Sequence, residues 1–260
     1  MKIQYYYIQR ELDRLKTKII YDKNSEGRPA WIYIEGLPKG VNFIMANLGK
    51  NVKEGQRIQY YKTYLPEGLF LPIDYNNDEM KKFYDKFSEI YDKELKSNKQ
   101  NLEAGKFLSE KLKKYSRKDI SILDLGAGTG LISEIYIDNG FKNITLVDYS
   151  RKMLNKAKSR KKLKNCKFIY CDIKKLDLKR KYDIVISNFS FGNPSYFTLK
   201  YLREAIKVVK KHMKPNSIIA IIGPFNRNII ENEFKKLESG IYTLNRNRKQ
   251  YTDFFIGSKN

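Results

Sequence analysis

The chain is predicted to adopt an α/β fold built on a largely parallel sheet, and three observations support this prediction. Short apolar segments alternate with amphipathic stretches of helical length through residues 120–237. A glycine-rich loop joins the first apolar segment to the helix that follows it. The chain then ends in two neighbouring β-like segments separated by a basic turn. Alternating strands and helices of these lengths favour parallel strands joined by right-handed crossovers.

The individual elements follow from runs of apolar residues and from helical spacing. Five apolar runs are expected to be buried strands: residues 120–125, 143–148, 167–171, 183–188 and 217–223. Helices are expected between and before them at residues 79–96, 102–115, 131–139, 151–158, 196–213 and 228–237. Residues 240–244 and 251–257 are expected to pair as an antiparallel hairpin. A sheet that is parallel for five strands and ends in a hairpin is an unusual combination.

The first 75 residues have a different pattern from the rest of the chain. Residues 3–20 show weak helical spacing, and β-like runs follow at 30–35, 41–48 and 57–64. Glycine and proline separate these runs, as expected of short strands joined by turns. We therefore expect a small N-terminal α+β region at 1–75, serving as a lid or as a substrate or partner module, followed by the α/β domain at 76–260.

Composition indicates a folded cytoplasmic protein. The chain is 41% hydrophobic and 13% aromatic, which is typical of a globular domain rather than a disordered one. No apolar run approaches the roughly 20 residues that a membrane span requires, and the N-terminus lacks an apolar signal core, so no membrane association is expected. Two cysteines, Cys166 and Cys171, and a single histidine do not form a usual zinc site. We expect no metal and two buried thiols.

The positive charge has two possible explanations. The formal charge is +23, and residues 151–181 carry 14 basic residues against only Asp172 and Asp177. Such a cluster attracts phosphate and would suit RNA. The simpler explanation is a lysine-rich composition whose side chains are solvated. Composition leaves both explanations open.

A glycine-rich loop and three acids suggest a nucleotide-like cofactor. Residues 122–130 run from a strand into a helix, and Gly126, Gly128 and Gly130 permit a sharp turn and close ligand approach. The amides at the helix start favour polar or anionic groups. The dinucleotide-binding pattern G-x-G-x-x-G/A fails, because Leu131 or Ser133 occupies the place of the third glycine.

The three acids lie at strand ends. Asp124 is able to accept a hydrogen bond from a cationic group such as the ammonium of methionine. Asp148 and Asp172 follow the next two strands, where they are suited to ribose hydroxyls and to an adenine amino group respectively.

Together these segments resemble the class I S-adenosylmethionine-dependent methyltransferases. The matching pieces are LDLGAGTG at 123–130, LVDYS at 146–150, YCDI at 170–173, YDIVISN at 182–188, HMKPNSIIAI at 212–221 and YTDFFIGSK at 251–259. They occur in the family's order and spacing over roughly residues 80–260. The resemblance implies a Rossmann-like seven-stranded sheet with a C-terminal antiparallel hairpin, and S-adenosyl-L-methionine as the cofactor.

The resemblance also implies roles for individual residues. The glycines would face the amino-acid end of the cofactor, Asp148 would bind ribose, Tyr149 would pack on adenine, and Asp172 with Ile173 would border the adenine. The expected cofactor-binding set is Asp124, Gly126, Ala127, Gly128, Gly130, Asp148, Tyr149, Asp172, Ile173 and Asn188.

A further segment, residues 84–92, resembles the helix that precedes the catalytic domain in ubiquinone/menaquinone-type C-methyltransferases and related small-molecule enzymes. In those enzymes an aromatic side chain of this helix often covers the cofactor, a role open here to Tyr84 or Tyr91. Packing of the same aromatic side chains in an apolar core is an equally good interpretation.

The acceptor is expected over residues 187–191. Amino-group methyltransferases of this fold carry Asn-Pro-Pro-Tyr there, whereas this chain has Asn188 followed by Phe189, Ser190 and Phe191. The difference weakens the prediction of an exocyclic amine as acceptor. No catalytic base is evident: His212 is expected at the surface, and Tyr196 and Asp253 are only speculative candidates. Alignment alone can supply much of the rate of a methyl transfer, so the catalytic residues stay unassigned.

Three functions are compatible with the sequence. The first is methylation of a small-molecule acceptor by direct SN2 transfer. The second is methylation of RNA (tRNA or rRNA) through the basic surface of residues 151–181, and the third is a non-catalytic S-adenosylmethionine-binding protein.

Overall fold

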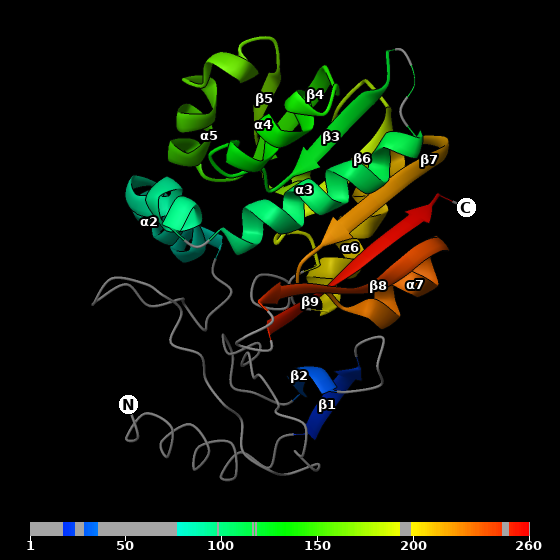
Figure 1. Ribbon diagram of the computed structural model, residues 1–260. Helices are drawn as coiled ribbons and strands as arrows, with labels where there is room; N and C mark the ends of the chain where they lie inside the picture. Colours follow the sequence, from blue (N-terminus) through cyan, green and yellow to red (C-terminus); the bar gives the residue numbers. More distant parts are fainter. Residues whose placement is uncertain are drawn as a thin grey trace, which may run out of the picture.

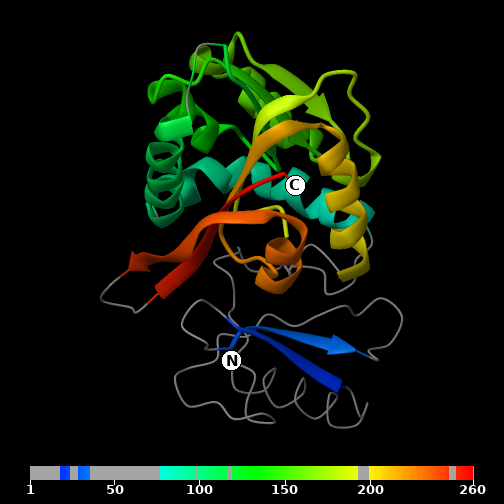
Figure 2. The same cartoon turned by 90° about the vertical axis from the view of Figure 1, so that its right-hand side faces the viewer.

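A seven-stranded mixed sheet with helices on both faces forms the body of the protein (Figure 1, Figure 2). The computed structural model describes residues 18–23, 29–35, 77–97, 99–115, 117, 119–192, 199–245 and 250–259. The strands of the large sheet are β3 (Ser121–Leu125), β4 (Asn143–Asp148), β5 (Lys167–Tyr170), β6 (Tyr182–Asn188), β7 (Met213–Ile222), β8 (Lys235–Asn245) and β9 (Gln250–Ser258). Their order across the sheet is β5-β4-β3-β6-β7-β9-β8.

The pairing of the strands confirms the predicted α/β fold. The strands β5, β4, β3, β6 and β7 are parallel, whereas β9 runs antiparallel to β7 and pairs with β8 as a hairpin. The helices are α2 (Asn77–Ser97), α3 (Gln100–Leu112), α4 (Leu131–Asp138), α5 (Arg151–Lys158), α6 (Leu199–Lys211) and α7 (Arg227–Glu233). Single 3-10 turns are η1 (Lys113–Tyr115), η2 (Lys161–Leu163) and η3 (Ile173–Lys175).

Two apolar cores hold the helices against the sheet. Successive side chains of a strand point to opposite faces, so Ile122 and Leu123 of β3 enter different cores. Helices α3, α4 and α5 pack in the core of Ile122, and α6 and α7 pack in the core of Leu123. Burial on both faces explains why the inner parallel strands β3, β4 and β6 are mostly apolar.

Two predictions about individual elements are wrong. Helix α7 ends at Glu233 rather than at 237, because the chain enters β8 at Lys235 and pairs there with Ser258. The two cysteines lie on either side of β5, not inside a buried strand, and both are half-buried. Their partial exposure follows from the place of β5 at the edge of the sheet.

The described part of the N-terminal region is one antiparallel pair, β1 (Lys18–Lys23) with β2 (Pro29–Glu35). The strand predicted at 30–35 is therefore confirmed. The helix predicted over 3–20 is wrong at its end, because residues 18–20 belong to β1. The rest of that helix and the β-like runs at 41–48 and 57–64 lie outside the described residues. No described helix is both long and apolar enough to cross a membrane.

Asp183 ties the amino ends of three parallel strands together. Its carboxylate accepts hydrogen bonds from the Ser121 backbone N–H (3.0 Å) and hydroxyl (2.6 Å) in β3, and from Lys214 Nζ (2.7 Å) in β7. Arg117 donates to its other oxygen at 2.6 Å. Burial works to raise the pKa of Asp183, but these hydrogen bonds outweigh it and hold the pKa well below its usual range.

We expect Asp183→Asn to lower the free energy of unfolding by roughly 2 kcal/mol, since hydrogen bonds to a charged group are lost. The exposed Asp177→Asn serves as the control and should change stability little. Because the folded-state pKa of Asp183 is depressed, its contribution is present at neutral pH and lost as pH falls below about 4. Urea unfolding of both variants between pH 3 and 7 measures this effect; equal acid sensitivity of wild type and Asp183→Asn would contradict it.

Candidate functional site

The candidate site lies at the carboxyl ends of β3, β4 and β6, where the glycine loop leaves β3. In an open parallel sheet, ligands bind at this edge. Gly126 and Gly128 adopt positive φ of 70° and 58°, a conformation in which glycine is unstrained. The glycine loop therefore lies at the edge of the sheet where the sequence predicts it.

The loop is fastened to β4 by its own backbone amides. Gly126 N and Ala127 N both donate to Val147 O, at 2.8 and 3.0 Å. Gly128 N donates to Asp148 Oδ2 at 2.8 Å. These three amides are not free to bind an anion, because β4 already accepts their hydrogen bonds. A phosphate-binding loop directs such amides at its ligand, so this loop is not built for phosphate.

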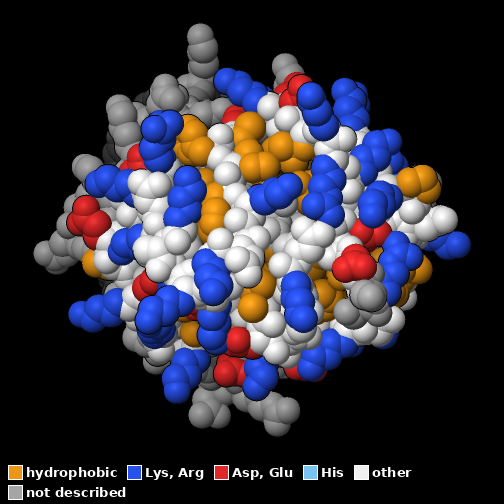
Figure 3. Space-filling model, turned by 90° about the horizontal axis from the view of Figure 1, so that it is seen from above, with side chains coloured by type: hydrophobic (Ala, Val, Ile, Leu, Met, Phe, Trp, Pro, Cys, Tyr) orange, Lys and Arg blue, Asp and Glu red, His pale blue; other side chains and the backbone are white. Residues whose placement is uncertain are grey.

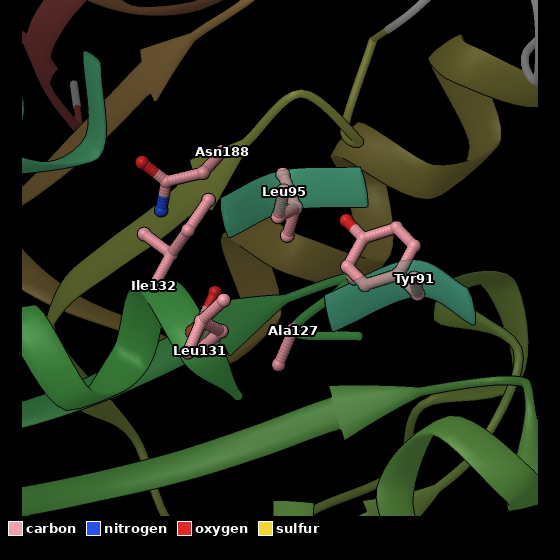
Figure 4. Close-up of a pocket in the computed structure, with 8 residues that line it drawn as sticks. Tyr91, Leu95, Ala127, Leu131, Ile132 and Asn188 are labelled. Atoms are coloured by element: carbon pink, nitrogen blue, oxygen red, sulfur yellow. The ribbon is translucent and has the colours of Figure 1, made fainter. Parts of the chain in front are cut away.

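A small pocket lies between this loop and helix α2 (Figure 4). The space within it, including the part open to solvent, is about 270 Å³. Tyr91 and Leu95 of α2 face Ala127 and Leu131 across it, and Asn188 approaches from β6. The complete lining is Tyr91, Leu95, Asp124, Gly126, Ala127, Leu131, Ile132 and Asn188.

Asp124 places a buried carboxyl group at this pocket. It is 2% exposed, and its Oδ2 accepts a hydrogen bond from Ser133 Oγ of α4 at 2.6 Å. Burial, with a further contribution from the charge of Asp148, raises the pKa of Asp124 to about 7, although the bond from Ser133 opposes the shift. A carboxylate that is costly to ionise in this position is stabilised by a cationic ligand.

Asn188 supplies the complementary donor. Its Oδ1 accepts a hydrogen bond from Tyr136 Oη at 3.4 Å, while its Nδ2 is buried and has no hydrogen-bond partner among the described residues. A buried amide donor without a partner is costly unless a ligand satisfies it. Asp124 as acceptor and Asn188 as donor fit the ammonium and carboxylate of an amino acid, and thus the methionine end of S-adenosylmethionine.

Asp148 and Tyr149 lie beside this pocket but do not line it. Both carboxylate oxygens of Asp148 accept backbone N–H groups, from Gly128 and from Ser150 at 2.8 Å each. Burial raises the pKa of Asp148 to about 6, against the effect of these bonds. Each oxygen keeps a second lone pair, so ribose binding by Asp148 stays a prediction. Tyr149 packs edge-on against Tyr84 of α2, with ring centroids 6.1 Å apart.

Three other predicted residues have structural partners. Asp172 caps η3 by accepting from Lys174 N at 2.9 Å, and it also accepts from the Tyr201 hydroxyl. The side chain of Ile173 lies in the apolar core. A β-carbon on Gly130 would lie 2.5 Å from Leu163 Cδ1, so Gly130 allows close packing of the helix and does not face the pocket. Their contacts with a cofactor stay predictions.

Helix α2 docks over the site through matching charges that sequence reasoning missed. The acids Asp85, Glu89 and Asp92 follow one face of α2 at helical spacing. The basic residues Lys152, Lys156 and Arg160 follow one face of α5 and its end at the same kind of spacing. The two faces meet, and spacings of three and four residues in both segments were the signal available in the sequence.

The contacts between these faces are hydrogen bonds as well as ion pairs. Asp85 accepts from Ser150 Oγ at 2.6 Å, and Lys156 Nζ donates to Ser88 O at 2.5 Å. Asp92 pairs with Arg160 and accepts from Thr129 Oγ1 of the glycine loop at 2.5 Å. Position 92 therefore links α2 directly to the loop.

Helix α2 covers the pocket with Tyr91 and Leu95 (Figure 4). The contacts that dock α2 therefore also hold the cover of the pocket in place.

Part of the basic cluster at residues 151–181 contacts acidic residues or backbone of the same chain. Lys152, Lys156 and Arg160 face α2, and Lys162 and Lys174 pair with Asp138 and Glu204. On the face of the molecule seen from above, Lys and Arg side chains are spread among neutral and hydrophobic surface (Figure 3).

The residues considered as a base or a ligand for a metal have other roles. His212 is buried; its Nδ1 lies 2.8 Å from Val208 O, and its Nε2 accepts from Leu178 N at 2.9 Å. Asp253 pairs with Arg227 at 2.5 Å. Tyr196 lies outside the described residues. Among the described residues, no group of three or more His, Cys, Asp or Glu side chains is placed to hold a metal ion.

Comparison with known proteins agrees with this geometry. The model of a family described as "Methyltransferase domain" matches residues 116–248. A malonyl-[acyl-carrier protein] O-methyltransferase of Bacillus anthracis is 34% identical over 126 residues, covering 47% of this chain and 45% of the relative. A demethylmenaquinone methyltransferase of Chlamydia pneumoniae is 28% identical over 149 residues, covering 56% and 62%. The chain thus spans about half the length of the first curated relatives that it matches.

Solved structures share the fold. The N-methyltransferase NodS from Bradyrhizobium japonicum WM9, in complex with S-adenosyl-L-homocysteine, superposes with a TM-score of 0.56 at 14% identity, covering 64% of this chain and 90% of NodS. The 1,6-didemethyltoxoflavin-N1-methyltransferase of Burkholderia thailandensis gives 0.56 at 12% identity, covering 71% and 88%. The predicted Rossmann-like sheet of class I methyltransferases is confirmed.

We expect Asp92→Ala to loosen α2, because Arg160 and Thr129 both lose their partner. A loss of roughly 1–3 kcal/mol corresponds to about tenfold to a hundredfold faster amide exchange in α2. Glu89→Ala is the matched control: Glu89 pairs with Lys152 at 3.6 Å, and both side chains are exposed, so little change is expected. Hydrogen-exchange mass spectrometry of the α2 peptides measures both variants, and equal effects of the two would contradict the role given to Asp92.

Proposed function

The chain belongs to the methyltransferase-domain family matched at residues 116–248, and we propose that it uses S-adenosyl-L-methionine to methylate a small acceptor molecule. The observation that carries the proposal is that Asp124 and Asn188 both line the same pocket. These groups match an amino-acid end, and the glycine loop beside them has no amides at Gly126, Ala127 or Gly128 left for phosphate.

The residues divide the binding task. Asp124 balances the ammonium group, and Asn188 Nδ2 donates to the carboxylate. Asp148 holds the ribose hydroxyls beside the loop, and Asp172 borders the adenine. The cofactor supplies an activated methyl group: in a direct SN2 step the acceptor atom bonds to the methyl carbon while the carbon–sulfur bond breaks. The chain supplies alignment and excludes water.

The acceptor group that suits this site best is a carboxylate. A carboxylate is ionised at neutral pH, so it needs no base, and positioning is able to supply roughly 7–11 kcal/mol of the barrier. Among the described candidates for a base, His212 is bound to the backbone at both ring nitrogens and Asp253 to Arg227. The malonyl-[acyl-carrier protein] O-methyltransferases among the relatives support an oxygen acceptor.

RNA methylation has less support. The basic cluster pairs in part with acids of the same chain, and Asn-Pro-Pro-Tyr is absent at residues 188–191. The third possibility is a protein that binds the cofactor without catalysis. Only a measurement of turnover distinguishes such a protein from an enzyme.

Incubation of the protein with methyl-labelled S-adenosylmethionine and a metabolite extract of the source cells should label a low-mass compound. Mild alkali should release the label as methanol, because a carboxylate acceptor yields a methyl ester. Asp124→Asn, which cannot balance the ammonium, should label far less. Label found only in RNA would overturn the small-molecule proposal. An alkali-stable product would overturn the carboxylate while leaving the methyltransferase intact.

Cofactor affinity should rise with pH through about 7, the pKa of Asp124. The neutral carboxyl group does not balance an ammonium, so affinity should weaken by roughly tenfold per pH unit below that value. Asn188→Ala should weaken binding equally at every pH, because an amide does not titrate in this range. Asp124→Asn should remove the pH dependence of cofactor affinity near pH 7. Any pH dependence that persists near pH 6 is assigned to Asp148. Calorimetry between pH 5.5 and 8.5 tests this; a flat profile for the wild type would contradict the role of Asp124.

A further inference from the structure

The backbone at Phe189, directly after β6, adopts a conformation that a bulky residue rarely takes. Its φ is +57°, and the other non-glycine residues with positive φ in the described chain are Asp119 (64°) and Asn216 (58°). Asp and Asn tolerate this region, whereas for an aromatic residue it is an outlier. Strained backbone of this kind persists only where the surroundings enforce it.

Hydrogen bonds from two neighbouring strands enforce it here. Phe189 N donates to Ile222 O at the end of β7, at 2.7 Å. Ser187 Oγ donates to Leu125 O at the end of β3 (2.9 Å) and accepts from Phe191 N (2.8 Å). The turn after β6 is therefore tied to the strands on both of its sides.

Gly223 leaves the room that this turn needs. A β-carbon at Gly223 would lie 2.7 Å from Phe189 Cα and 3.0 Å from Phe189 N, and both are backbone atoms. The φ of Gly223 is +128°, which side chains disfavour. Any larger residue at position 223 must therefore push Phe189 out of place.

The consequence of the turn is the position of Ser190. A β-carbon built on Gly126 would lie 1.9 Å from Ser190 Oγ, so the hydroxyl group rests directly against the glycine loop. Ser190 is half-buried, and its hydroxyl makes no hydrogen bond to a described residue. Gly126 and Asn188 line the pocket next to it.

We propose that Gly223 is a positioning residue that acts through Phe189, and that Ser190 is the polar contact for the acceptor at the point of methyl transfer. The inference rests on the proposed function, because it gives the acceptor side of that same site its residues. By holding Phe189 in the left-handed conformation, Gly223 keeps Ser190 against the glycine loop, between the cofactor pocket and the end of β7. A hydroxyl donor there suits the carboxylate acceptor.

The first test compares Gly223→Ala with Gly140→Ala. Gly140 also has a positive φ, +93°, but a β-carbon there meets nothing within 4 Å, so it controls for backbone strain alone. Gly223→Ala should lower kcat by roughly tenfold to a hundredfold, as expected for a misplaced acceptor group. Its Kd for S-adenosylhomocysteine, measured by calorimetry, should change by less than about threefold. Gly140→Ala should keep both values. Equal kcat in all three proteins would overturn the inference.

A second pair separates the conformation of Phe189 from its side chain, and remains informative if Gly223→Ala fails to fold. Asn tolerates positive φ and β-branched Val does not, so Phe189→Asn should retain more of kcat than Phe189→Val. Ser190→Ala should raise KM for the acceptor with cofactor affinity unchanged. Equal loss in Phe189→Asn and Phe189→Val, or unchanged KM in Ser190→Ala, would overturn the inference.

The acceptor used in these assays is the compound labelled in the metabolite extract. If the wild type labels no low-mass compound, the proposed function fails, and crystal structures of the S-adenosylhomocysteine complexes then decide the inference. Displacement of Ser190 from Gly126 in Gly223→Ala, but not in Gly140→Ala, supports it. An unmoved Ser190 overturns it.

Discussion

The carbonyl of Val147 and the carboxylate of Asp148 accept the three successive amides of the glycine loop, and the rest of the site depends on this attachment. It curls the loop back over β4 and leaves no amide at these positions for an anionic ligand. In the proposed function, recognition of the ligand therefore falls to side chains, above all Asp124 and Asn188. A loop of nearly the same composition would bind phosphate if its amides pointed outward; the difference lies in the strand that accepts them.

The electrostatics of the cleft favour a cation for the same reason. Asp124 and Asp148 are both buried, and burial raises the pKa of both because it makes their ionisation costly. Asp85 of α2 adds a further negative charge near Asp148. A ligand with an ammonium group relieves this cost. Asp85 also contacts Ser150 where α2 docks on α5, so one carboxylate contributes both to helix docking and to the negative charge near Asp148.

The sequence predicted the sheet, its hairpin and the position of the glycine loop, because apolar periodicity and glycine spacing are local signals. Asp124 was named because it lies just before the glycines, and Asn188 because of the family resemblance; both line one pocket. The sequence did not predict that Val147 O consumes the loop amides, that Ile173 turns into the core, or that α7 gives way to β8 at Lys235. Each of these depends on a partner distant in the chain. The sequence does show the spacing of the acids in α2 and of the basic residues in α5. Which helices pack against each other, however, is set by the fold.

Different interactions hold the two halves of the candidate site. A substitution can therefore alter one half and leave the other in place. Hydrogen bonds that the glycine loop donates to the Val147 carbonyl and the Asp148 carboxylate hold the proposed cofactor half. Close approach of Gly223 to Phe189 holds the proposed acceptor half, and it depends on the residues at two positions. On this proposal, a substitution at the end of β7 reshapes the acceptor side without disturbing the loop. The glycine loop is recognisable from a short motif, whereas the contact between Gly223 and Phe189 becomes visible only once β6 and β7 are placed side by side.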